Sequence, residues 1–257
     1  MSTAVADVKT ALTEGLTDLR LPTVRRCYED AARLAERETL SYERYLLELV
    51  TRECEDRRHK RIQRLLRQSR IPAEKSLANF NLKRLPPKVG LMTKGLLEGE
   101  FLDRRENVLA FGNPGSGKTH LLCAIGQELI ARGRRLYFTT SALLVQDLLV
   151  AKRDLKLSRF LKRLGCFEGL IIDDLGYVQQ SREEMEVLFT LLAERYERGS
   201  VLMSSNLPFS KWEGIFKDPM TTAAAIDRLV HHCVILELNI PSYRVEQAKK
   251  AKEEKPA

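Results

Sequence analysis

The chain has 257 residues, and its 43 basic and 35 acidic side chains give a formal net charge of +8, which favours a polyanionic partner. Apolar residues make up 44% and charged residues 30%, a composition that is typical of a globular protein and excludes a disordered or fibrous chain. No apolar run reaches the roughly 18 residues of a membrane helix and no secretion signal begins the sequence, so we expect a cytoplasmic protein without membrane contact.

Residues 1–74 are predicted to form a small all-helical domain that binds DNA or a protein partner. They contain no β-rich run, and the clearest helix is expected to begin after Ser41, an N-cap residue, and to end near Ser69. Apolar residues follow one side of this helix and basic residues the other. The basic side, which we call the first basic stripe, consists of Arg57, Lys60, Arg61, Arg64 and Arg67. These residues either contact DNA or form salt bridges with the acid-rich neighbouring segment.

The pattern changes in the second part of the chain. Residues 75–106 contain several prolines and glycines and are interpreted as a linker with one short helix. From residue 107 onward, short apolar runs alternate with helical patterns, which predicts an α/β fold with a parallel sheet flanked by helices over residues 107–244. Residues 245–257 are a charged tail. The expected strands cover 107–111, 136–139, 169–172, 201–204 and 233–238, and the expected helices include 119–132, 142–164 and 183–198.

A complete phosphate-loop pattern, G-x-x-x-x-G-K-[ST], lies between the first expected strand and the helix that follows it. Its glycines allow backbone N–H groups to point at phosphate, and the helix adds the positive end of its dipole. Lys118 is expected to contact the β and γ phosphates, and Thr119 to bind Mg²⁺, so the predicted cofactors are ATP and Mg²⁺. The predicted nucleotide-binding residues are Gly112, Asn113, Pro114, Gly115, Ser116, Gly117, Lys118, Thr119 and His120.

Polar side chains follow two of the other expected strands. Asp173 is predicted to reach Mg²⁺ and Asp174 to orient the attacking water, although paired acids can also begin a turn. Asn206 is predicted to hydrogen-bond the water or the γ-phosphate, or else to form a turn before Pro208. Arg228 is a candidate arginine finger, with a surface arginine paired to an acid as the alternative.

The cysteines and two adjacent histidines are predicted to have structural roles. The five cysteines are odd in number and widely scattered, and we interpret them as reduced core thiols. Neither of two adjacent histidines near residue 231 has a metal-binding partner at a useful spacing, so both are expected to be structural. These residues are Cys27, Cys54, Cys123, Cys166, Cys233, His231 and His232.

With these motifs in this order, the chain resembles the AAA+ ATPases and, within them, the IstB-like and DnaC-like group. The segments LIIDDLG (170–176), SSNLP (204–208), DRL (227–229) and PSYR (241–244) are similar to those of IstB-like transposition helper ATPases. The resemblance covers about residues 75–244, and the helical domain before it also fits. It implies ATP and Mg²⁺ binding, Asn206 as the sensor 1 residue, and Arg228 acting on the nucleotide of a neighbouring subunit, hence a homo-oligomer with shared ATP sites.

Two features depart from the wider AAA+ pattern. Many AAA+ proteins have glutamate where this chain has Asp174, so a shorter side chain must position the water and turnover is expected to be slow. Little sequence follows Arg244, so we expect no full helical lid domain, as in others of this subgroup.

A second basic stripe lies in the helical segment 142–164 and includes Lys152, Arg153, Lys156 and Arg159. In related initiators and helicase loaders the matching region faces nucleic acid, so we expect contacts with the DNA backbone here, against the alternative of a solvated face. Aromatic residues are only 7% of the chain and none interleaves either stripe, which favours duplex DNA over stacked single strands.

The function predicted from these features is that of an ATP-dependent, DNA-binding AAA+ regulator of transposition. It would oligomerise on duplex DNA, hydrolyse ATP with Mg²⁺ under DNA stimulation, and recruit or activate a partner transposase. One alternative is a DnaC-like loader whose N-terminal helices bind a replicative helicase. Another is a small-molecule P-loop kinase, whose turnover would depend on an acceptor metabolite and not on DNA.

Overall fold

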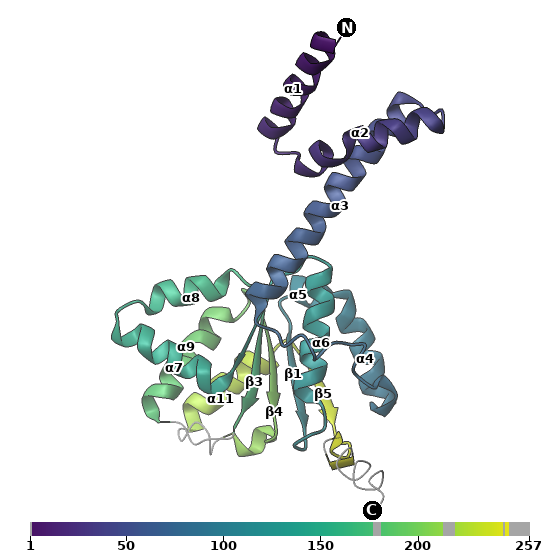
Figure 1. Ribbon diagram of the computed structural model, residues 1–257. Coiled ribbons are helices and arrows are strands. Elements are labelled where there is room, and N and C mark those ends of the chain that lie inside the picture. The colour runs from purple at the N-terminus through teal and green to yellow at the C-terminus, as the bar shows by residue number, and fades with distance from the viewer. Residues whose placement is uncertain (1, 177–180, 213–218, 244, 247–257) are drawn as a thin grey trace, which may run out of the picture. The chain divides into compact units, whose positions relative to one another are not determined.

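The structure is a computed structural model that describes residues 2–176, 181–212, 219–243 and 245–246. The chain divides into two compact units, residues 1–64 and 65–257 (Figure 1). Arg244 and residues 247–257 of the expected charged tail lie outside the described residues. Of the helices that the structure describes, none combines the length and the apolar character needed to cross a membrane.

The first unit consists of three helices, α1 (Ser2–Asp18), α2 (Pro22–Arg37) and the first part of α3 (Tyr42–Ser69). Proline is favoured at the first position of a helix, because its missing N–H would have no partner there, and Pro22 begins α2 in this way. Apolar residues on the three helices make a small common core. Its buried members are Leu16, Val24, Ala31 and Leu49.

A buried carboxylate in this unit holds two helices together. Glu53 on α3 accepts hydrogen bonds from the backbone N–H of Thr23 (2.8 Å) and of Val24 (3.2 Å), which are unpaired amides of the first turn of α2. It also accepts one from Arg57 Nε (2.8 Å). Burial raises the pKa of Glu53, but these contacts outweigh it and the net pKa lies below the ordinary value.

The first basic stripe is therefore not uniform. Arg57 pairs with Glu53, and Lys60 Nζ lies 2.6 Å from a carboxylate oxygen of Asp56, so two of its cations are engaged on their own helix. Both acids lie in the acid-rich residues 53–56 directly before the stripe, so the salt-bridge alternative holds for these two cations. The other three cations are exposed and have no ion pair with a described residue.

The second unit is built on a parallel five-stranded sheet with the order β2-β3-β4-β1-β5. This confirms the predicted α/β class. All five expected strands are present, with ends that differ by up to three residues. The strands are β1 (Asn107–Gly112), β2 (Leu136–Thr140), β3 (Gly169–Leu175), β4 (Ser200–Ser205) and β5 (Cys233–Leu238).

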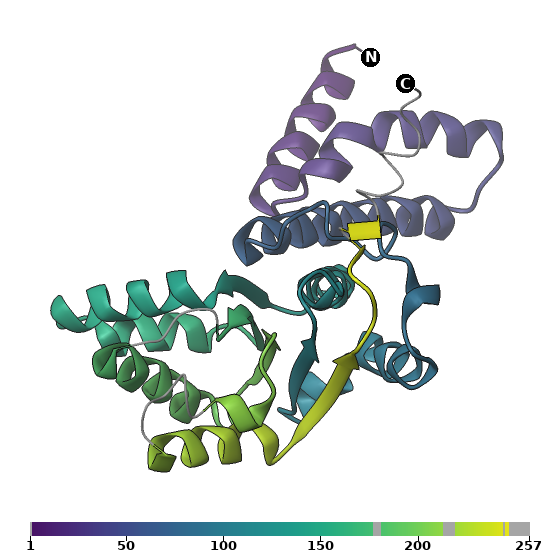
Figure 2. The same cartoon turned by 90° about the horizontal axis from the view of Figure 1, so that it is seen from below.

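Helices cover both faces of the sheet, and Figure 2 shows the two layers. Alternate residues of each strand point to opposite faces, so Leu109 and Ile172 enter one core while Val108 and Ile171 enter the other. Both faces of a parallel sheet need such cover, which explains the continuous apolar runs of its strands. One layer contains α7 (Ser141–Arg153), α8 (Leu157–Gly165), α9 (Arg182–Arg195) and α11 (Pro219–Val230), and the other contains α4 (Pro87–Glu98), α5 (Glu100–Asp103) and α6 (Lys118–Ala131).

Two segments differ from the expected elements. The linker holds η1 (Leu82–Arg84), α4 and α5 where one short helix was expected, because Gly99 takes φ +85° and ends one helix while the next begins. The single helix expected over 142–164 is two helices, α7 and α8, separated by a turn at 154–156. A short 3₁₀ turn, η2 (Phe209–Lys211), follows β4.

The cysteines are all free, as predicted, but two of the five are not in a core. Cys123 is buried, and burial raises its pKa to about 12, so this thiol is unreactive. Cys54 and Cys166 are exposed. The core part of the prediction is wrong for these two, because an apolar neighbourhood along a helix does not decide which side of it faces solvent.

Candidate functional site

The phosphate loop connects β1 to α6, and its glycines allow backbone contacts that no other residue would permit. Gly115 takes φ +80°, and a Cβ there would lie 2.1 Å from Ser242 Oγ. A Cβ on Gly112 would lie 2.3 Å from the carbonyl oxygen of Leu238 at the end of β5. These two close approaches place the loop against the chain that follows β5.

Lys118 lies inside the loop and is largely buried. Its Nζ donates to the carbonyl oxygens of Gly112 (2.8 Å) and Asn113 (3.0 Å) and to Asn206 Oδ1 (2.5 Å). Asn206 follows β4, and so an ammonium group from the phosphate loop and an amide from another strand meet at one point. The sheet explains the meeting, because the carboxyl ends of its parallel strands share one edge.

Asp173 accepts hydrogen bonds from two hydroxyl groups at the same edge of the sheet. Thr119 Oγ1 at the start of α6 donates to its Oδ1 at 2.7 Å, and Ser204 Oγ on β4 donates to that same oxygen at 2.5 Å. Ser204 also accepts a hydrogen bond from the backbone N–H of Asp174 (2.9 Å). Sequence reasoning did not assign Ser204 a role, although it stands two residues before Asn206 on the same strand.

Asp174 has an unusual backbone that brings its side chain into the site. Consecutive side chains of a regular strand point to opposite faces, yet Asp173 and Asp174 both line one cavity. The reason is a left-handed conformation at Asp174 (φ +67°) together with a register shift between β3 and β4. Asn206 Nδ2 donates to Asp174 Oδ1 (3.2 Å), and Ser141 Oγ donates to the Asp174 carbonyl oxygen (2.8 Å).

These groups surround a cavity of about 270 Å³ at the carboxyl edge of the sheet. Its lining includes most of the phosphate loop, the two aspartates, Ser204 and Asn206. Of the predicted nucleotide residues, Gly112 and Asn113 contribute through the carbonyl groups that hold Lys118. His120 lines the cavity, and its Nε2 lies 2.9 Å from the carbonyl oxygen of Ser76.

Two walls of the cavity come from segments without a predicted site role. The Phe80 ring packs edge-on against the His120 ring, with centroids 5.2 Å apart. The backbone N–H of Tyr243 donates to the Gly115 carbonyl oxygen (3.0 Å), and the Arg84 guanidinium lies over the Tyr243 ring. Both aromatic rings line the cavity. Only the aromatic character of Phe80 before the phosphate loop, and of Tyr243 in the PSYR segment, could have signalled these positions.

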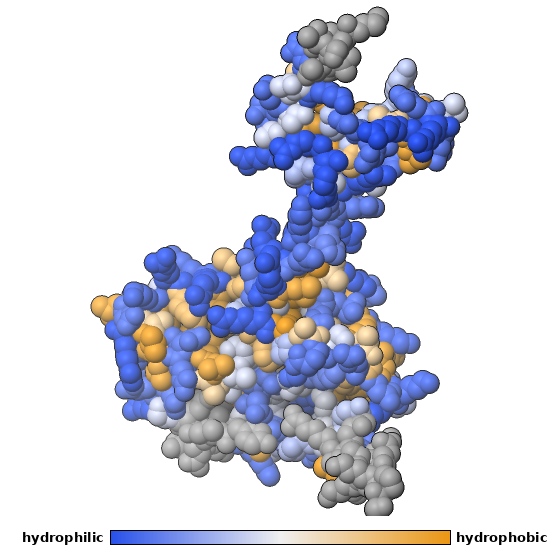
Figure 3. Space-filling model, viewed as in Figure 1, coloured by the Kyte–Doolittle hydropathy of each residue, from blue (hydrophilic) through white to orange (hydrophobic). Residues whose placement is uncertain are grey.

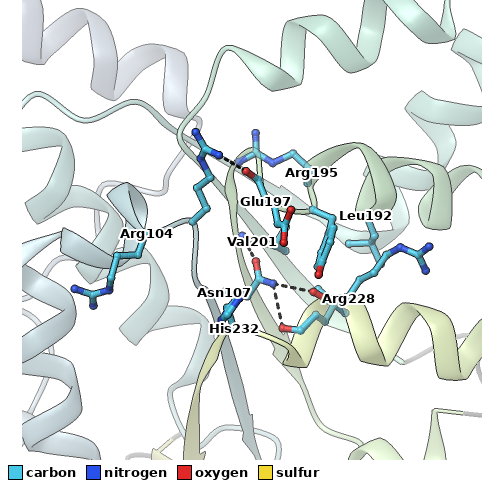
Figure 4. Close-up of a pocket in the computed structure, with 11 residues that line it drawn as sticks. Arg104, Asn107, Leu192, Arg195, Glu197, Val201, Arg228 and His232 are labelled. Carbon is cyan, nitrogen blue, oxygen red and sulfur yellow. Dashed lines mark hydrogen bonds between the residues drawn. The ribbon is translucent and has the colours of Figure 1, made fainter.

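Arg228 does not line this cavity. It lies in the last turn of α11 at the opposite edge of the sheet, beside Asn107, Val201 and His232, where the strands begin (Figure 4). Its Nη1 donates to the carbonyl oxygen of Ala224 (2.9 Å) and its guanidinium lies over a phenylalanine ring of α9, 4.9 Å from the ring centroid. It has no ion pair with an acid among the residues that the structure describes, contrary to the surface-pair alternative.

The same edge holds the two histidines. The Tyr196 hydroxyl lies 3.0 Å from His231 Nδ1, as a structural role requires. Glu197 also lies near both histidines, with the three potential ligand atoms within 4.8 Å of one another, so the expectation that they lack a metal-binding partner is wrong. Positive charge from Arg105 and Arg228 in the adjoining cavity opposes a cation there.

The second basic stripe is exposed on α7, α8 and the turn between them. Lys152 pairs with Glu186 (3.1 Å) and Lys156 with Asp154 (3.1 Å). For Arg153 and Arg159 the described part of the chain offers no ion pair. Neither basic stripe contributes to the lining of the nucleotide cavity.

The fold and the site together define a class. A phosphate loop after β1, acids at the end of β3 and a polar residue after β4, on a sheet of this strand order, are those of an AAA+ P-loop protein. AMPPCP-bound DnaA from Aquifex aeolicus matches with a TM-score of 0.57 and 19% identity, over 72% of this chain and 57% of that one. The DnaC helicase loader matches with a TM-score of 0.52 and 19% identity, over 63% of this chain and 97% of that one.

Sequence comparison gives the family. The model of the IstB-like ATP binding proteins matches residues 14–251, and the chain belongs to this family. An insertion sequence ATP-binding protein of Sinorhizobium fredii is 42% identical over 92% of this chain and 80% of its own length. The ATP-binding protein of insertion sequence IS5376 from Geobacillus stearothermophilus is 35% identical over 92% of this chain and 94% of its own length. The predicted family is therefore confirmed, and with it ATP as the nucleotide.

Proposed function

We propose that this chain is an ATP-dependent, DNA-binding AAA+ ATPase that regulates transposition. It forms oligomers on duplex DNA and recruits or activates a partner transposase. The observation that carries the proposal is the meeting of Lys118, Asp173 and Asn206 in one cavity, in a chain whose relatives are ATP-binding proteins of insertion sequences. Residues 107–244 serve as the ATPase core, and residues 1–74 contact DNA or the partner.

The oxygen donors beside Asp173 fit Mg²⁺. The carboxylate of Asp173 and the hydroxyl of Thr119 lie 2.7 Å apart, and Mg²⁺ prefers oxygen ligands of this kind. These two residues would hold the ion, which when bound neutralises charge on the β and γ phosphates. Ser204 keeps the Asp173 carboxylate oriented by donating to it.

Hydrolysis requires a group that orients water and takes its proton. Asp174 is suited to this role, because its carboxylate lines the cavity and is oriented by the Asn206 amide. Asn206 contacts Lys118 through its oxygen and Asp174 through its nitrogen. It is thus suited to sense the γ-phosphate that Lys118 would contact and to adjust the water-orienting carboxylate in response.

Arg228 would act on the nucleotide of a neighbouring subunit. Its position at the opposite edge of the sheet supports this role, since its guanidinium lies outside the cavity of its own chain. A cation supplied by a neighbour stabilises negative charge in the transition state of phosphoryl transfer. Hydrolysis would therefore depend on assembly.

Duplex DNA would be bound through phosphate contacts from both basic stripes. The contacts are best supported for exposed cations without an ion pair among the described residues. These are Arg153 and Arg159 in the second stripe and Arg61, Arg64 and Arg67 in the first. In the first stripe, Arg57 and Lys60 would have to leave acids of their own helix to contact DNA.

A DnaC-like loader of a replicative helicase is the second candidate, and the similarity to the DnaC fold favours it. At 19% identity that similarity carries the fold alone, whereas the relatives at 42% and 35% identity are ATP-binding proteins of insertion sequences. The test is to measure ATP hydrolysis and assembly, by electron microscopy, with and without long duplex DNA. The proposal expects ATP-dependent oligomers on the duplex and faster hydrolysis, and it is wrong if duplex DNA changes neither.

The partner is tested separately. A transposase and a replicative helicase are each added to the ATP-bound protein on DNA, and retention of each is measured by co-sedimentation. The proposal expects retention of the transposase and stimulation of its strand transfer. Retention of the helicase alone would favour the loader.

A further inference from the structure

The turn between α7 and α8 contains a leucine in an unexpected conformation. The backbone N–H of Leu155 donates to the carbonyl oxygen of Lys152 (3.1 Å), and that of Lys156 donates to the carbonyl oxygen of Ala151 (2.8 Å). This pair of bonds closes the end of α7 and requires a left-handed residue at Leu155, where φ is +56°. Glycine is the usual residue at such a position, because a side chain there collides with its own backbone.

Leu155 is unusual in a second respect, which is the exposure of its side chain. Its side chain is 94% exposed, the largest exposed fraction among the large apolar side chains that the structure describes. The other non-glycine residues with a left-handed backbone are polar or charged. A left-handed backbone and an almost fully exposed apolar side chain at one residue point to a role outside the folded chain.

The surroundings of Leu155 are strongly cationic. Lys152, Arg153, Lys156 and Arg159 lie within four residues of it, against one acid, Asp154. In Figure 3 hydrophobic surface is visible at the edge of the molecule where α7 turns into α8, beside hydrophilic surface. This combination fits a polyanion with an apolar interior. It does not fit an apolar protein groove, which would have to desolvate Arg153 and Arg159, the two cations of the stripe without an ion pair to a described residue.

We propose that Leu155 is an apolar wedge that enters the minor groove of duplex DNA while the neighbouring cations contact the phosphates on both sides. This inference rests on the DNA-binding role proposed above and adds a deformation of the duplex to it. Proteins that insert apolar side chains between base steps unstack them partly and bend the helix toward the major groove. The turn between α7 and α8 carries this side chain on the protein surface, where it is almost fully exposed.

The test compares wild type with Leu155→Gly. Glycine suits the left-handed backbone, so the variant removes the side chain without straining the turn, and its melting temperature should not fall. Leu91→Ala, which shortens an exposed leucine of α4 outside both basic stripes, is the matched control. The readouts, with ATP present, are affinity over a series of salt concentrations, end-to-end energy transfer on a doubly labelled duplex, and permanganate reactivity of unstacked thymines.

We expect Leu155→Gly to bind duplex DNA roughly five- to tenfold more weakly, with an unchanged salt slope, reduced energy transfer and loss of permanganate reactivity. Leu91→Ala should behave as wild type. The wedge is overturned if Leu155→Gly bends and unstacks the duplex as wild type does while both bind with the same salt slope. If wild type itself fails to bind duplex DNA in a salt-dependent manner, the proposed DNA role fails and the wedge fails with it.

Discussion

Lys118 is the residue on which nucleotide binding should depend most. Its buried ammonium group is held by two loop carbonyls and by Asn206, and these contacts aim it into the loop where phosphates would lie. We expect Lys118→Ala to weaken ATP binding by about tenfold to a hundredfold, because a charge-assisted contact with phosphate is lost. Fluorescent-nucleotide titration checks this, with the exposed Lys88→Ala as control. Wild-type affinity in Lys118→Ala would remove this residue from the site.

Asp174→Asn should separate binding from hydrolysis. Asparagine tolerates the left-handed backbone of this position, so the local structure should survive the change. The variant should bind ATP normally and hydrolyse it about a hundredfold or more slowly, since the group that accepts the proton of water is lost. It should also remain on DNA longer with ATP. Single-turnover hydrolysis measures the effect, and an unchanged rate would exclude Asp174 from the chemistry.

At the scale of elements, Glu53 links the stability of α2 and α3 to pH. Folding lowers its pKa below the ordinary 4.5, so its stabilisation is complete above that value and is lost as the pH falls through the folded pKa. Glu53→Gln should lower the free energy of unfolding by about 1–3 kcal/mol at neutral pH and by less in acid. Melting curves at neutral pH and at acid pH test this, with the exposed Glu55→Gln as control. A difference between wild type and Glu53→Gln that does not shrink in acid would contradict the assignment.

The second basic stripe can be tested by its response to salt. Arg153 and Arg159 are exposed and lack an ion pair with a described residue, so each is available to a phosphate. Replacing both with glutamine should weaken binding to all duplex sequences similarly and reduce the slope of log affinity against log salt by about two units. Lys88→Gln is the matched control. An unchanged slope would show that the second basic stripe is an ordinary solvated surface.

The strands were predictable because each is a short apolar run between polar segments, and burial on both faces leaves few other structures for such a run. The meeting of Lys118, Asp173 and Asn206 was also foreseeable, since parallel strands end at a common edge. The left-handed backbone at Asp174 was not. It depends on a register shift between two strands, and nothing in the local residue pattern marks that shift.

Other features arise from contacts between distant residues. Tyr243 follows β5 and contacts Gly115 in the loop after the neighbouring β1, and Phe80 contacts His120. Apart from their aromatic character, nothing in the local sequence marks these residues as cavity walls. The turn that divides α7 from α8 was missed because Leu155 occupies a position where glycine would have marked the end of a helix. Because Leu155 is not a glycine, nothing in the sequence marks the end of α7.

For the whole molecule, the separation of Arg228 from the nucleotide cavity is the central feature. One edge of the sheet holds the phosphate loop and both aspartates, and the other holds this arginine. In the proposed assembly, Arg228 of one protomer would act at the site of a neighbour, because it lies outside the cavity of its own chain. ATP hydrolysis would then report contact between subunits on DNA, as expected of a protein that must complete an assembly before it activates a partner.

Complementation between two inactive variants tests this claim most directly. Arg228→Ala should bind ATP and hydrolyse it poorly, because it offers no cation to a neighbour, and Asp174→Asn should be inactive because its own site lacks the carboxylate. When the two are mixed on duplex DNA, one kind of interface joins an intact Asp174 to an intact Arg228. We predict partial recovery of ATP hydrolysis in that mixture, with co-assembly verified by fluorescent labels on the two variants. No recovery from variants that demonstrably co-assemble would show that Arg228 does not act on a neighbouring subunit.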